Sequence, residues 1–124
     1  MSVAGFLSRG DLRSVVSTDV SNRAVTIETR TELDDILAAR ERVLVMVRTA
    51  GCTICKSMDP IIDNVARATD VAVVDFNPKA DLDAVAEFNV RSVPTFLLFE
   101  NGAVVDRIAD GFVPTADLVD FVER

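Results

Sequence analysis

Two patterns of apolar and polar positions recur along the chain, and together they predict the order of its strands and helices. Unbroken apolar or β-branched runs are typical of strands, and apolar residues every three or four positions are typical of helices. The predicted strands are 24–29, 43–47, 71–76, 95–100 and 103–109. Two of the predicted helices follow the caps Thr31 and Thr115, and two more cover about 52–68 and 81–88. The predicted order is β-α-β-α-β-α-β-β-α, an α/β arrangement.

The last two predicted strands flank Asn101-Gly102. Asn-Gly between apolar runs is a strong hairpin signal, because both positions tolerate a positive φ. We therefore expect these two strands to be antiparallel. Residues 1–22 have a weaker pattern and form a predicted N-terminal extension, either a short amphipathic helix near 11–18 or a mobile tail. Residues 23–124 form the predicted domain, and the chain length suits one domain.

The charge of the chain limits its partners and its location. Acidic residues outnumber basic ones 20 to 13, which gives a net charge of -7. Such a surface repels nucleic acid and anionic lipid, so we expect neither as a partner. It serves solubility or reflects a salty cytoplasm. No apolar run approaches the ~20 residues of a membrane span, and Arg9, Asp11 and Arg13 make the start a poor signal peptide. We expect a cytoplasmic protein, in which a stable structural disulfide is unusual.

The two cysteines of the chain, Cys52 and Cys55, lie where a predicted strand gives way to a predicted helix. A structural zinc site needs four Cys or His ligands, and the chain has no His, so we predict no metal site unless two chains share one. The pair is otherwise inert and buried, or it is a redox dithiol. The helix start favours the dithiol, because free N–H groups and the helix dipole lower the pKa of a thiol there. Cys55, one turn later, is placed to attack a mixed disulfide at Cys52.

The motifs around the pair extend this interpretation. The sequence Cys-Thr-Ile-Cys is followed by Lys56 and, one turn later, by Pro60. Further along come "VRSVPT" with Pro94, then Asn101-Gly102, then Gly111. In this order and spacing, residues 23–124 resemble thioredoxin. The resemblance implies the thioredoxin fold, a central mixed β-sheet of about five strands flanked by four helices.

The resemblance also implies an activity, the reduction of protein disulfides. Cys52 is then the nucleophile and Cys55 the resolving thiol. The redox-active disulfide is the only redox group needed, so no bound cofactor is expected. The implied partners are protein disulfides and a thioredoxin-reductase-like electron donor, and the implied state is a monomer. The alternative is a thioredoxin-fold interaction or redox-switch module without general reductase turnover.

A cis peptide bond and a docking surface are also implied. Val93-Pro94 is then a cis bond that faces the dithiol and leaves the backbone at Val93 free to pair with a substrate strand. Otherwise, Pro94 is a proline at the start of a strand. The docking surface should be apolar and open, and it comprises Gly51, Ile54, Phe76, Ser92, Val93, Pro94 and Gly111.

The sequence departs from the family pattern around the dithiol. Gly51 replaces an aromatic residue that usually flanks the site. Arg48 stands where a second aromatic residue is common, and either favours the Cys52 thiolate or is solvated. Met46 occupies the position of the buried acid of the family, and Val73 is taken as the position of its lysine partner. On this alignment, the family's ionisable pair behind the dithiol is gone.

Asp59 is the candidate substitute for the missing acid. Helical geometry places it at the edge of the apolar arc of the 52–68 helix, on the same face as Cys55. Partial burial would raise its pKa, so that it accepts the Cys55 proton during resolution. The alternative is an exposed carboxylate at the edge of the arc.

Overall fold

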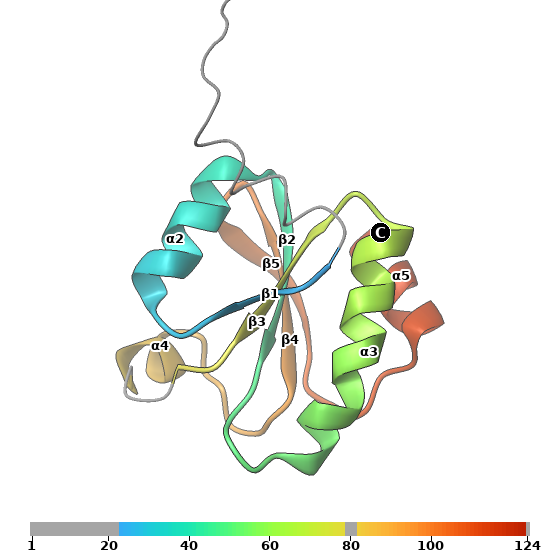
Figure 1. The fold of residues 1–124 in the computed structure, drawn as a ribbon. Helices are drawn as coiled ribbons and strands as arrows, with labels where there is room; N and C mark the ends of the chain where they lie inside the picture. The colour runs from blue at the N-terminus through green and yellow to red at the C-terminus, as the bar shows by residue number, and fades with distance from the viewer. Residues whose placement is uncertain (1–22, 79–81, 124) are drawn as a thin grey trace, which may run out of the picture.

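A computed structural model describes residues 23–78 and 82–123 (Figure 1). The order of strands and helices is the predicted one. The strands are β1 (Val25–Ile27), β2 (Arg42–Val47), β3 (Ala72–Phe76), β4 (Thr95–Glu100) and β5 (Ala103–Ile108). The helices are α2 (Arg30–Ala39), α3 (Thr53–Ala68), α4 (Leu82–Glu87) and α5 (Thr115–Glu123). The helix or tail predicted for residues 1–22 lies outside the described residues.

The five strands form one mixed sheet in the order β1-β3-β2-β4-β5. The β1–β3 and β2–β3 pairs are parallel, and the β2–β4 and β4–β5 pairs are antiparallel. The predicted hairpin is confirmed, because Asn101 and Gly102 have φ values of 53° and 87° between antiparallel β4 and β5. The mixed five-stranded sheet flanked by four helices is therefore confirmed.

Helices cover both faces of the sheet, which explains the unbroken apolar strands at its centre. Figure 1 shows α3 and α5 on one face and α2 and α4 on the other. Alternate residues of β2 point to the two faces: Leu44 and Met46 pack in the cluster with α3 and α5, and Val43 and Val45 pack in the cluster with α2. This two-residue period decides which side chains lie behind the start of α3.

Two predicted helix caps are shifted in the structure. Thr29, and not Thr31, caps α2: its side chain accepts a hydrogen bond from the Glu32 amide, and Glu32 bonds back to the Thr29 backbone. This reciprocal pair is a capping box, which leaves Thr31 inside the first turn. Thr115 is the first residue of α5, and the prediction made it the cap before that helix.

Candidate active site

The two cysteines meet at the point where the chain leaves the sheet and enters α3. Cys52 is the N-cap of α3, with an extended backbone, and its Sγ accepts a hydrogen bond from the Cys55 amide at 3.1 Å. The two residues form a disulfide, with their Cα atoms 5.3 Å apart. Cys55 is completely buried, whereas Cys52 is partly exposed. Of the two residues, only Cys52 therefore has surface that a large substrate can contact. The order of attack stays a prediction.

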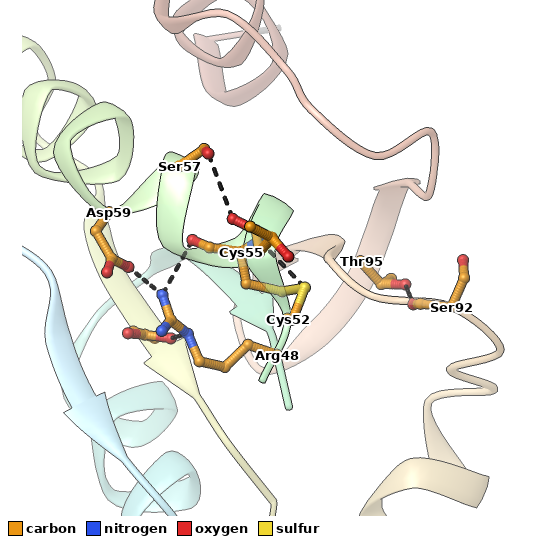
Figure 2. Close-up of a disulfide and its surroundings, with 9 residues drawn as sticks. Arg48, Cys52, Cys55, Ser57, Asp59, Ser92 and Thr95 are labelled. Atoms are coloured by element: carbon orange, nitrogen blue, oxygen red, sulfur yellow. Dashed lines mark hydrogen bonds and ion pairs between the residues drawn. A yellow bond between two sulfur atoms is a disulfide. The ribbon is translucent and has the colours of Figure 1, made fainter. Parts of the chain in front are cut away.

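Arg48 lies beside the disulfide and is not solvated. Its side chain is only 17% exposed, and its Nη2 donates a hydrogen bond to the Cys55 carbonyl at 3.2 Å. The same nitrogen pairs with the Asp59 carboxylate, as Figure 2 shows. Its Nε lies 2.8 Å from Asp75 Oδ1, and both of these atoms are shielded from solvent. The solvated alternative for Arg48 is therefore wrong, because the guanidinium joins α3 to β3.

The ionisable pair of the family is absent at Met46 and Val73, but a different ion pair lies beside the dithiol. The parallel register places Asp75, and not Val73, opposite Met46, whereas Val73 is opposite Leu44. Asp75 is 8% exposed, and Asp75 and Thr95 are the buried polar residues among those the structure describes. An acid on β3 and a base after β2 thus form an ion pair beside the position of Met46. The pattern of "VAVVDF" contained the signal, since an Asp in an apolar strand is unexpected.

The environment of Asp75 makes its carboxylate easier to protonate. Burial raises the pKa of Asp75 above its usual value of 3.8, the Arg48 guanidinium opposes that rise, and the nearby Asp59 and Asp63 carboxylates add to it. Raised carboxylate pKa values are common at sites that exchange protons near neutral pH. Asp75 is therefore a second candidate for proton exchange beside the disulfide.

The raised pKa gives a testable dependence of stability on pH. Between the unfolded and folded pKa values, the folded protein binds more protons than the unfolded one, so Asp75 makes the free energy of unfolding fall as pH rises. Asp75→Asn removes this titration. Urea unfolding of the oxidised proteins between about pH 4 and about pH 7 should show the variant gaining stability relative to the unmodified protein as pH rises. A difference that is constant or falls with pH would contradict the assignment.

Asp59 lies on α3 at the edge predicted for it. Its side chain is 50% exposed, and its carboxylate is ion-paired with Arg48. The pairing makes Asp59 part of the charge cluster beside Cys55, together with Asp75. Its role as the acceptor of the Cys55 proton stays a prediction, and Asp75 is the more buried of the two carboxylates.

The predicted docking surface is largely open, with two errors, because Phe76 and Pro94 are buried. Gly51, Ile54 and Ser92 are exposed, and Val93 and Gly111 are partly exposed. Phe76 is wrong as a docking residue, because it is completely buried in the cluster on the α2 face of the sheet. The sequence analysis missed Phe112, which is 52% exposed next to Gly111, and an aromatic residue after a loop glycine was the available signal.

The Val93-Pro94 bond is cis, as expected. Pro94 itself is buried at the start of β4, and Val93 remains partly exposed before it. The Thr95 hydroxyl donates a hydrogen bond to the Ser92 carbonyl at 2.6 Å and so holds this loop from inside (Figure 2). The loop therefore presents the Val93 backbone next to an anchored, buried threonine.

Gly51 offers a test of how the missing aromatic residue affects substrates. Its φ of +81° strains any other L residue by about 1 kcal/mol, although nothing lies within 4 Å of a Cβ placed there. Gly51→Trp should raise the turnover of a protein disulfide and change the rate with a small disulfide little, because aromatic side chains contribute much of the energy of protein contacts. Gly51→Ala is the matched control, since it shares the backbone strain without the ring. Equal gains on both substrates would contradict a docking role.

The described part of the chain offers neither a metal-binding cluster nor a membrane-spanning helix. No group of three or more His, Cys, Asp or Glu residues within it is arranged to hold a metal ion. None of its helices is long and apolar enough to cross a membrane.

Comparisons with known proteins agree with this geometry. The thioredoxin family profile matches residues 24–124. A thioredoxin from Mycoplasma genitalium is 33% identical over 90 residues, which are 72% of this chain and 87% of that protein. A bifunctional thioredoxin reductase/thioredoxin from Mycobacterium leprae is 31% identical over 77% of this chain and 22% of its own length. Among solved structures, a mutant thioredoxin from Halobacterium salinarum superposes with a TM-score of 0.78 at 27% identity, covering 83% of this chain and 90% of that one.

The family profile matches most of the chain. The structure also has the disulfide at the start of α3 and the cis Val93-Pro94 bond. The chain therefore belongs to the thioredoxin family, and it is a thiol–disulfide oxidoreductase that acts through Cys52 and Cys55.

Proposed function

We propose that this oxidoreductase works as a cytoplasmic monomer that reduces protein disulfides and is recharged by a thioredoxin-reductase-like donor. The observation that carries the proposal is the asymmetry of the disulfide, in which Cys52 is partly exposed and Cys55 is completely buried. A buried second sulfur is protected from external disulfides, so the mixed disulfide at Cys52 is resolved from within. The two sulfurs carry the electrons, and the proposal includes no bound cofactor.

The surface around Cys52 supports a protein substrate. Ile54 and Phe112 are large apolar side chains that are 45% and 52% exposed, and Val93 is partly exposed before β4. An extended segment of a substrate can add main-chain hydrogen bonds there while its side chains contact the apolar residues. The net charge of -7 argues against nucleic acid and anionic membranes as partners.

Insulin reduction tests the proposal. The protein with dithiothreitol should precipitate insulin far faster than dithiothreitol alone, and NADPH with a thioredoxin reductase should replace dithiothreitol as the electron source. Failure with both donors would instead favour the interaction or redox-switch module. Turnover by the protein with dithiothreitol, but not with NADPH and the reductase, would support the reductase activity and contradict the proposed electron donor.

A further inference from the structure

The charges beside Cys55 form a compact cluster with one excess negative charge. Arg48 contributes one positive charge, and Asp59 and Asp75 contribute two negative charges when both are ionised. One guanidinium contacts both carboxylates and also the Cys55 carbonyl. Uptake of one proton would make the cluster neutral, which is favourable where solvent does not screen the charge.

The two carboxylates differ in their exposure to solvent. The Asp59 side chain is 50% exposed, whereas that of Asp75 is 11% exposed and its Oδ1 is shielded from solvent. The charged groups that affect Asp75 are Arg48, from the loop after β2, and Asp59 and Asp63, from α3. On the other side of β3, the residue of β1 paired with Asp75 is the uncharged Thr26.

Asp75 also lies on the face of the sheet against which α3 packs. Val73, two residues before it, belongs to the cluster that includes Met58 of α3, and Met46, opposite Asp75, belongs to the same cluster. Cys55 is buried on the inward face of the first turn of α3. The guanidinium of Arg48 contacts both the Asp75 carboxylate and the Cys55 carbonyl.

We propose that Asp75, rather than Asp59, accepts the proton of Cys55 during resolution, and that Arg48 is a positioning residue that holds this carboxylate against the first turn of α3. This inference deepens the proposed function and rests on it. Proton transfer to a carboxylate occurs directly or through one water molecule. Burial raises the pKa of Asp75, which brings that pKa nearer to the pKa of a thiol.

The step balances in atoms and electrons. The Cys55 Sγ forms a bond to the Cys52 Sγ, and its proton moves to the Asp75 carboxylate. The bond between Cys52 and the substrate sulfur breaks, and the substrate sulfur leaves with the bonding electron pair as a thiolate. The cysteine pair is oxidised by two electrons, and the substrate disulfide is reduced by two. Asp75 later returns its proton to solvent.

Stopped-flow reaction of the reduced protein with dithionitrobenzoate separates the two steps. The first coloured thiolate is released by the attack of Cys52, at a rate proportional to the reagent concentration. The second is released by Cys55, at a rate independent of that concentration. The released thiolate needs no proton from the protein, so the second rate reports deprotonation of Cys55 and closure of the disulfide.

Asp75→Asn should slow the second phase by about tenfold or more near pH 7 and abolish the inflection that Asp75 gives to its pH profile. The first phase should change less than about twofold. Asp59→Asn is the matched comparison, because it makes the same change in the other carboxylate that Arg48 contacts. It should shift the Asp75 inflection of the second phase without abolishing it, and slow that phase far less than Asp75→Asn does. Arg48→Lys, which keeps the charge but not the planar fork, should slow the second phase and shift its pH profile while sparing the first.

The outcomes distinguish the two candidate carboxylates. An unchanged second phase in Asp75→Asn would overturn the inference, and a loss confined to Asp59→Asn would place the acceptor on α3. An absent first phase in the unmodified protein would instead contradict the proposed function. Carboxyl NMR titration of the unmodified protein supplies a check that needs no variant. The pKa of Asp75 should differ between the oxidised and reduced forms, and equal values would contradict the inference.

Discussion

Cys52→Ser is expected to abolish disulfide reduction, whereas Cys55→Ser should trap a covalent complex with the substrate. Cys52 is the partly exposed sulfur at the N-cap of α3, where it already accepts a hydrogen bond from the Cys55 amide. The same donor can stabilise the Cys52 thiolate in the reduced protein. Cys55 is completely buried, so it reaches only a sulfur already attached to Cys52.

Mass spectrometry of each variant after reaction with a protein disulfide measures the result. The Cys55→Ser protein should carry one substrate chain on Cys52, releasable by dithiothreitol. The Cys52→Ser protein should carry none and should show no insulin reduction. A substrate adduct on Cys55 in the Cys52→Ser protein would reverse the assigned roles.

Arg48→Met is expected to give the largest loss of stability among single changes around the site. It leaves the buried Asp75 carboxylate without its cation, at a cost of about 3 kcal/mol in the free energy of unfolding near pH 7. The cost should shrink at acidic pH, because protonation of Asp75 removes the unpaired charge. Urea unfolding of the oxidised protein at both pH values measures it.

Two further variants test the cause of that loss. Arg48→Met combined with Asp75→Leu should recover most of the stability, since it removes both charges of the buried pair. Arg67→Met is the control, because Arg67 is exposed on α3 and bonds to the nearby Asn64 side chain, and it should change stability by less than about 0.5 kcal/mol. A loss in Arg48→Met as small as that in Arg67→Met would show that the pair contributes little.

Local patterns in the sequence were sufficient for the order of the strands and helices, and the family resemblance supplied the arrangement of the sheet. The apolar run of β2 and the Asn101-Gly102 hairpin are set by burial and by backbone geometry, which neighbouring residues determine. The N-cap of α2 could also have been predicted from the sequence, because Thr29 and Glu32 have the spacing of a capping box. Family spacing then located the dithiol and the cis bond at Val93-Pro94.

The charge cluster could not be obtained in this way, because it depends on contacts between segments. Asp75 lies beside Met46 through the parallel register of β2 and β3, which no local pattern specifies. The two-residue period of β3 does, however, separate Val73 and Asp75 from Phe76, which faces the other side of the sheet. Applying that period would have removed Phe76 from the docking surface and drawn attention to Asp75.

The redox potential of the Cys52–Cys55 pair tests most directly whether the protein is a reductase. It is measured by equilibrating the protein with defined ratios of reduced and oxidised glutathione or thioredoxin and quantifying both forms after acid quenching. We expect a reducing potential, near the value of about −270 mV found for thioredoxin. A potential near about −120 mV, typical of a strong disulfide oxidant, would contradict it.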